Sequence, residues 1–201
     1  MSFYIIDKDD MIFIPFDILA IDFEFVSTRI IKNKAKRYLQ EIVEIGAILK
    51  SDLGEFEYTT IVKPKNFIEC REKENKCIYA SRFSMDEINN GISLMEAIDN
   101  LEEYYTPNET VWISWGIVEY RILKNLCESY RFKVPFLYDD YLDLSEEFRR
   151  FYNLSHKVSL DKALNMLHIK SSIRHFALED SKLLLKILHK MFIEGYRIGE
   201  E

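Results

Sequence analysis

Residues 17–26 form the stretch Asp17-Ile-Leu-Ala-Ile-Asp22-Phe-Glu24-Phe-Val26, which has the apolar composition of a buried strand but carries acidic residues within it. Because strand side chains alternate between the two faces of a sheet, Asp22 and Glu24 point to one side, and Phe23 and Phe25 point to the other. Two carboxylates on one face repel each other unless they are protonated, solvated or bridged by a cation. This stretch therefore predicts a core strand that carries part of a metal site.

The hydrophobic pattern changes from strands to helices along the chain. Turn residues and short apolar runs predict strands at 3–6, 11–14, 17–26, 42–49, 56–62, 111–115 and, less regularly, 138–142. Helical spacing and two capping-box sequences, beginning at Ser84 and Ser93, predict helices after 84, after 93, and at 118–130, 145–152, 159–167 and 176–194. Antiparallel strands followed by alternating strands and helices indicate an α/β fold with a mixed sheet.

The composition is that of a single globular domain. The chain has 201 residues, of which 48% are hydrophobic, and we expect one domain over 1–201, with an extra hairpin in 1–15 and a core from about 16 to 194. No long apolar run predicts a membrane segment, and three cysteines without paired spacing favour free thiols and a cytoplasmic location. The net charge of -7 argues against nucleic-acid binding through bulk charge, but not against an enzyme that binds nucleic acid through metal ions.

Two further groups of chemically active side chains lie at predicted element boundaries. The sequence His175-Phe-Ala-Leu-Glu-Asp180 opens the last helix, and Trp115-Gly-Ile-Val-Glu119 joins a strand to a helix. Taken alone, Asp180 and Glu119 have an ordinary explanation, because acids are favoured near helix N-termini. His175 is equally explained as a surface histidine.

Taken together, the three groups resemble the motifs of the DEDDh 3′–5′ exonucleases in order and spacing. This family includes the DNA polymerase III epsilon subunit, RNase T, and the KapD-like and 3′-end RNA exonucleases. The resemblance extends from about residue 16 to 188 and includes the strand sequence Glu41-Ile-Val-Glu-Ile-Gly-Ala. It implies a ribonuclease H-like fold, in which a five-stranded mixed sheet is flanked by helices.

The resemblance also implies a role for each motif residue. Asp22 would bridge two Mg²⁺ or Mn²⁺ ions, Glu24 and Asp180 would complete the first metal position, and Glu119 would lie near the second. His175 would be the general base, and the product would be a nucleoside 5′-monophosphate released from a 3′ end. This chemistry is coherent, because two divalent ions can both activate water and neutralise developing charge on a phosphodiester.

The chain departs from the family at Glu119, where the family usually has Asp. Mg²⁺ requires near-ideal geometry at about 2.0–2.1 Å, so a side chain longer by one methylene can displace the second ion or its water. We expect activity that is reduced or prefers Mn²⁺, rather than abolished.

Substrate contacts are expected from aromatic and basic residues near the motifs. Phe25, Phe83 and Trp115 are candidates for stacking on single-stranded bases, although each has the alternative role of a core aromatic. The basic run 29–37, including Lys34 and Arg37, follows the first motif and either contacts phosphates or forms a solvated face. The segment 65–81 is either a surface loop or an insertion near the substrate entrance.

The leading prediction is a metal-dependent exonuclease that acts on single-stranded RNA or DNA 3′ ends. RNA is favoured by the similarity to stand-alone RNA exonucleases, and the chain is expected to be a monomer or a homodimer without a membrane partner. Two alternatives stay open: an exonuclease-like regulator that binds nucleic acid or protein, and a metal phosphoesterase for small nucleotides.

Overall fold

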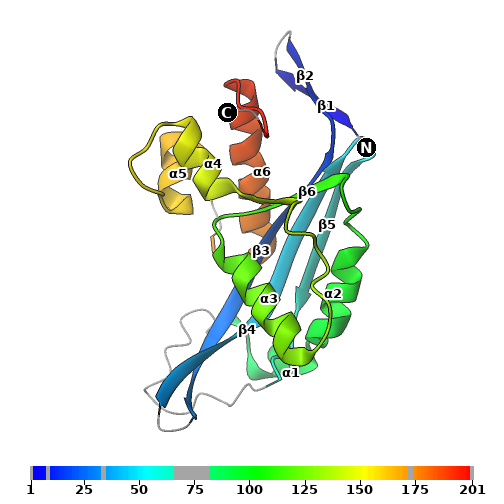
Figure 1. The fold of residues 1–201 in the computed structure, drawn as a ribbon, viewed down its shortest axis with the longest axis vertical. Helices are drawn as coiled ribbons and strands as arrows, with labels where there is room; N and C mark the ends of the chain where they lie inside the picture. Colours follow the sequence, from blue (N-terminus) through cyan, green and yellow to red (C-terminus); the bar gives the residue numbers. More distant parts are fainter. Residues whose placement is uncertain (1, 8–9, 33–34, 66–81, 172–173, 200–201) are drawn as a thin grey trace.

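A five-stranded mixed sheet forms the centre of the computed structural model, which describes residues 2–7, 10–32, 35–65, 82–171 and 174–199 (Figure 1). Its strand order is β5-β4-β3-β6-β7, and a separate hairpin pairs β1 with β2. The strands are β1 (Phe3–Asp7), β2 (Asp10–Ile14), β3 (Asp17–Lys32), β4 (Ala35–Ser51), β5 (Gly54–Ile61), β6 (Thr110–Ser114) and β7 (Tyr141–Asp143). The helices are α1 (Met85–Asn90), α2 (Leu94–Glu102), α3 (Val118–Tyr130), α4 (Leu144–Phe151), α5 (Leu160–Met166) and α6 (Ala177–Ile193).

The predicted ribonuclease H-like α/β class is confirmed by this architecture. β3, β4 and β5 pair antiparallel, whereas β6 and β7 run parallel to β3. β3 and β4 are longer than the sequence pattern predicts, because β3 extends to Lys32 and β4 begins at Ala35, both within the basic run 29–37. The side chains of that run, including Arg37, and the whole of Lys34 and of 66–81 lie outside the described residues.

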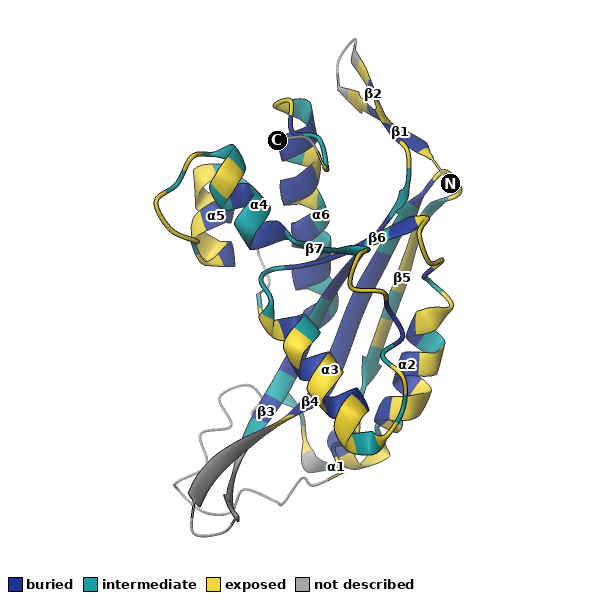
Figure 2. Cartoon of the chain, in the orientation of Figure 1, coloured by how far each residue is buried: buried dark blue, intermediate teal, exposed yellow. Residues whose placement is uncertain are grey.

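Two hydrophobic cores lie on opposite faces of the sheet (Figure 2). Ile18 and Ala20 of β3 pack toward α4, α5 and α6, whereas Leu19 and Ile21 pack toward α2 and α3. Strand alternation produces this division, and each fully buried isoleucine or leucine side chain stabilises the fold by about 1.5–3 kcal/mol. Both cores include residues of β3, the strand that carries Asp22 and Glu24, so the helix layers on the two faces of the sheet hold this strand between them.

Side-chain caps begin the first two helices near the predicted positions. Ser84 and Glu87 form a complete capping box at α1, because each side chain bonds to the backbone of the other. At α2, the Ser93 side chain accepts a hydrogen bond from the backbone of Glu96, and the described contacts include no reciprocal bond. No described helix is long and apolar enough to cross a membrane.

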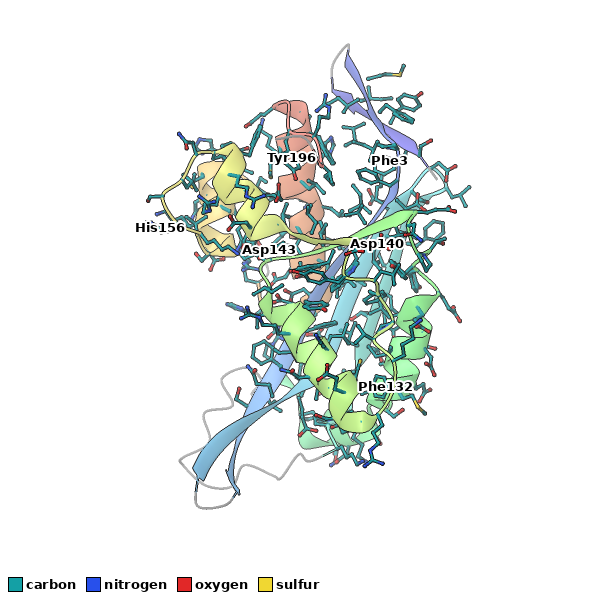
Figure 3. All side chains as sticks on the ribbon, viewed as in Figure 1. Phe3, Phe132, Asp140, Asp143, His156 and Tyr196 are labelled. Atoms are coloured by element: carbon teal, nitrogen blue, oxygen red, sulfur yellow. The ribbon has the colours of Figure 1, made fainter. Side chains whose placement is uncertain are left out.

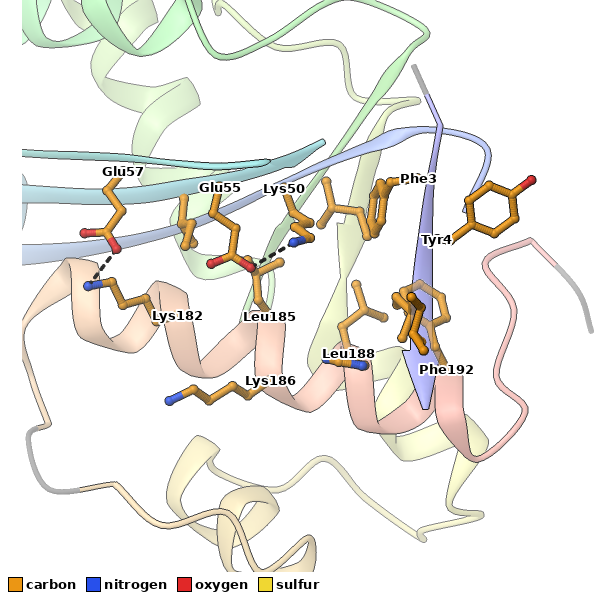
Figure 4. A pocket seen from close by; sticks show the side chains of 15 residues that line it. Phe3, Tyr4, Lys50, Glu55, Glu57, Lys182, Leu185, Lys186, Leu188 and Phe192 are labelled. Carbon is orange, nitrogen blue, oxygen red and sulfur yellow. Dashed lines mark hydrogen bonds and ion pairs between the residues drawn. The ribbon is translucent and has the colours of Figure 1, made fainter. Parts of the chain in front are cut away.

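The N-terminal hairpin packs one apolar face on the α6 side of the molecule. Phe3 and Ile5 are buried there, whereas Tyr4 is exposed, and Figure 4 shows Phe3 and Tyr4 pointing to opposite sides of β1. Beside the hairpin lies a pocket of about 420 Å³ between β1, β5 and α6, with the ion pairs Lys50–Glu55 and Lys182–Glu57 along it. A second pocket, of about 380 Å³, lies beside Tyr130 and Phe132 on the opposite core.

Candidate active site

The acid pair of β3 lies opposite β4 at an irregularity in the strand register. Asp22 pairs with Gly46 and Glu24 pairs with Glu44, and the register then shifts by one residue before Phe25. Phe25 packs against the core formed with α2 and α3, so the predicted division between the two strand faces is confirmed. Such β-bulges are common beside active sites, where they redirect a side chain.

Helix α6 is attached to β4 by polar contacts at its first turn. The backbone N–H of Ala177 donates to Glu44 Oε2 (3.2 Å), and the Ser181 hydroxyl donates to the Gly46 carbonyl (2.8 Å). Glu44 therefore satisfies a helix N–H that the N-cap residue, Phe176, does not bond through its side chain. This attachment places the buried Asp180 over the acid pair of β3.

Three of the predicted residues meet closely enough to hold one cation. One ligand atom each from Glu24, His175 and Asp180 lies within 4.8 Å of the others. His175 is exposed and has a positive φ of 63°, and its backbone N–H donates to Asp180 Oδ2 (3.2 Å). The left-handed conformation of His175 turns the chain into α6 while the histidine stays at the edge of the carboxylate group.

Asp22 is coupled to the other acids through its charge. Burial raises the pKa of Asp22 well above its usual range, and the charges of Glu119, Asp180 and Glu24 raise it further. Each of these three carboxylates thus acts on Asp22, although Asp22 is not within the 4.8 Å group. Asp22 is thus affected by acids from β3, α3 and α6.

Burial also favours the protonated form of Glu24 and Glu119. It raises the pKa of Glu24 to about 7 against the opposing effect of Arg82, and the pKa of Glu119 to about 7, with a further contribution from the charge of Asp143. Figure 3 marks Asp143 at the junction of β7 and α4, where its carboxylate accepts hydrogen bonds from Ser145 and the α4 backbone. Asp143 is therefore already used as a helix cap.

Glu119 has the properties of an unsatisfied ligand. It lies in the first turn of α3, is 9% exposed, and its Oε2 is buried without a hydrogen bond to any residue that the structure describes. A buried carboxylate oxygen without a partner is costly, and a cation or its bound water relieves this cost. The residues present therefore fit divalent metal ions, because the donors are carboxylate oxygens and one imidazole.

Two arginines that sequence analysis did not identify contact the same acids. Arg82 Nη2 lies 3.5 Å from Glu24 Oε1 and 3.2 Å from Glu44 Oε2. Arg174 pairs with Asp180 through Nη1 and with Asp161 through Nε (2.7 Å). Glu44 carried a signal in the sequence, as an acid within an apolar strand, whereas Arg82 and Arg174 had none.

The predicted stacking residues have different surroundings. Trp115 is half-buried, donates its indole N–H to the Val158 carbonyl (3.1 Å), and packs on Phe148. Phe25 is half-buried against a core, and the Phe83 ring lies 5.4 Å from the Arg82 guanidinium carbon. Of the three, Phe83 lies beside Arg82, which in turn contacts Glu24.

The two pockets described above lie away from this acid group. None of the five predicted motif residues lines either of them. The candidate active site is therefore a cluster of charged side chains at the junction of β3, α3 and α6, apart from both of these pockets.

Comparisons with known proteins find a similar exonuclease sequence and similar nuclease folds. No family model matches the sequence. The probable 3′-5′ exonuclease KapD of Bacillus subtilis (strain 168) is 25% identical over 172 residues, which cover 85% of this chain and 82% of the relative.

Solved structures show the same fold. The nuclease domain of 3′hExo, a DEDDh family member bound to rAMP, covers 92% of this chain and 96% of its own, with a TM-score of 0.72 and 22% identity. A structure of 3′-end specific recognition of histone mRNA stem-loop by 3′-exonuclease covers 89% of this chain and 64% of its own, with a TM-score of 0.69 and 20% identity.

Proposed function

We propose that this protein, whose relative and fold support its assignment to the DEDDh 3′–5′ exonucleases, removes nucleotides from the 3′ ends of single-stranded RNA in a metal-dependent reaction. The observation that carries the proposal is the meeting of Glu24, His175 and Asp180 within 4.8 Å. These residues come from segments about 150 positions apart and converge on one face of β3. They supply oxygen ligands and a proton acceptor in one place.

The motif residues divide into metal ligands and a base. Asp22, Glu24 and Asp180 would hold the first of two Mg²⁺ or Mn²⁺ ions, with Asp22 shared, and Glu119 would serve the second position. Such ions, when bound, lower the pKa of water and neutralise charge on the phosphodiester. His175 accepts the proton of the attacking water, because its ring lies beside the Glu24 and Asp180 oxygens and is open to solvent.

RNA is proposed over DNA because of the neighbouring structures. The similar nuclease domain was solved with rAMP, and a second similar exonuclease with a histone mRNA stem-loop. In this chain, Phe83 and the exposed Phe176 flank the Arg82 side chain beside Glu24. Aromatic faces beside a carboxylate group are suited to stacking a terminal base.

The direct test is a time course on 5′-labelled single-stranded RNA and DNA with Mg²⁺ or Mn²⁺. We expect a ladder shortened from the 3′ end, faster on RNA, and a rate lower by about 10²–10⁴-fold in His175→Ala. His156→Ala is the matched control, because His156 is an exposed loop histidine bonded to Ser155. RNA binding without cleavage would contradict the enzyme and favour a binding regulator.

The residue that differs from the family gives a separate prediction. Glu119→Asp shortens the side chain, and we expect the Mg²⁺-dependent rate to rise relative to the Mn²⁺-dependent rate, because Mg²⁺ tolerates misplaced ligands less well. Initial rates with each metal, measured on the same substrate, give this ratio for both proteins. Unchanged rates with both metals would show that the length of the Glu119 side chain does not limit the reaction.

A further inference from the structure

Two arginines are each shared between an acid of the proposed metal site and a second acid outside it. Arg82 contacts Glu24 and Glu44, and Arg174 contacts Asp180 and Asp161. Both guanidinium side chains are only 20% exposed. The same arrangement thus occurs twice, once at Glu24 and once at Asp180.

The shared acids have two competing uses. Glu24 and Asp180 cannot offer the same lone pairs to a guanidinium and to a divalent cation at full strength. Glu44 and Asp161 are the outer acids, and Glu24 and Asp180 are the inner ones. The outer acids have no such conflict, since Glu44 is bonded to the α6 backbone and Asp161 lies exposed on α5. Each arginine therefore has one partner that metal binding would affect and one that it would not.

The outer partners keep the guanidinium groups near the site in either case. Arg82 also lies 4.4 Å over the Phe176 ring, and its Nε and Nη1 are buried without hydrogen bonds to the described residues. An arginine released from a carboxylate retains donors that match the oxygens of a phosphate. A phosphate bound at Glu24 and Asp180 would lie next to the guanidinium groups that contact these two acids.

We propose that Arg82 and Arg174 are exchangeable counter-ions of the site. Each arginine releases its inner carboxylate, Glu24 or Asp180, to a divalent cation and then binds a phosphate of the nucleotide. Glu44 and Asp161 act as positioning residues that hold the guanidinium groups during the exchange. This inference rests on the proposed function and adds a phosphate-binding role for two residues outside the family motifs.

The test separates metal binding from nucleotide binding, and it does not depend on activity. Isothermal titration measures the Kd of Mn²⁺ alone, and then the Kd of adenosine 5′-monophosphate at saturating Mn²⁺. In Arg174→Met, which lacks the competing charge, we expect Mn²⁺ to bind about tenfold more tightly and the nucleotide about tenfold more weakly. A purely structural arginine would instead weaken both.

A second variant shifts the metal affinity in the opposite direction. Asp161→Asn removes the outer partner of Arg174, so the guanidinium should pair more strongly with Asp180 and weaken Mn²⁺ binding by severalfold. Arg149→Met is the control, because Arg149 pairs with Glu146 on α4 and should change neither Kd.

The outcomes are distinct. An unchanged Mn²⁺ affinity in both Arg174→Met and Asp161→Asn, or full nucleotide affinity in Arg174→Met, would overturn the exchange while leaving the exonuclease intact. Wild-type protein that binds no Mn²⁺ would overturn the proposed function as well.

Discussion

Asp22→Asn is expected to abolish exonuclease activity while stabilising the protein in the absence of divalent ions. Burial, followed by the charges of Glu119, Asp180 and Glu24, raises the pKa of Asp22 well above its usual range. Ionised Asp22 is therefore unfavourable in the folded state above its ordinary pKa, and an amide of the same shape removes that cost. The same change removes the carboxylate that the proposed mechanism shares between two ions.

Two measurements on one variant establish the effect. With EDTA at about pH 8, we expect a higher Tm, by about 2–4 °C for each kcal/mol gained by a chain of this size. With Mn²⁺, we expect the rate to fall by more than about 10²-fold, because even the loss of residues that support metal ligands has effects of 10–100-fold.

Asp99→Asn is the matched control, because it removes one charge from an exposed position on α2, beyond the first turn of the helix. It should change neither the Tm nor the rate measurably. A lower Tm in EDTA for Asp22→Asn, or retention of activity, would show that Asp22 is a structural acid rather than part of a metal site.

Gly46→Ala is expected to have the largest effect on stability. A methyl group at Gly46 would lie 2.0 Å from the backbone carbon of Ala177 and 2.0 Å from the backbone nitrogen of Leu178. These are backbone atoms of α6, so the contact cannot be relieved by turning a side chain. The first turn of α6 must move away from β4, and His175 and Asp180 must move with it.

We expect a loss of about 3 kcal/mol or more in the free energy of unfolding, at or above the upper end of ordinary overpacking. Urea unfolding monitored by circular dichroism measures this loss, and activity should fall in parallel. Thr59→Ala is the control, because Thr59 is exposed on β5 and pairs directly with Gly46. Near-wild-type stability of Gly46→Ala would contradict the close contact between α6 and β4.

The opposite changes in stability expected for Asp22→Asn and Gly46→Ala distinguish two kinds of residue at the site. On these expectations, Asp22 opposes folding and is explained by the proposed metal chemistry, whereas Gly46 allows α6 to pack on β4 and so positions His175 and Asp180. Asp22 would oppose stability, whereas Gly46, its partner on β4, would support it. An acid that opposes folding is expected where it has a chemical role, so this contrast agrees with selection for catalysis at Asp22.

Much of the fold followed from local patterns in the sequence. Alternation along 17–26 predicted β3 and the common face of Asp22 and Glu24, and the helix predicted at 118–130 matches α3. These features depend on side-chain direction and hydrophobic period, which are properties of a few neighbouring residues. The extension of β3 and β4 beyond the apolar core was not predictable in this way, because backbone pairing continues there through residues of mixed polarity that lack a clear alternation.

The sequence by itself determined which residues can carry metal chemistry: acids placed in an apolar strand and at two helix starts, with a histidine five residues before the last acid. Only the tertiary structure decided that Glu44 would hold α6 from 133 positions away, and that Arg82 and Arg174 would pair with the acids of the site. The physical reason is that charge interactions depend on distance in space. Two groups far apart in the chain have no shared local pattern until the folded sheet and helices bring them within a few ångströms.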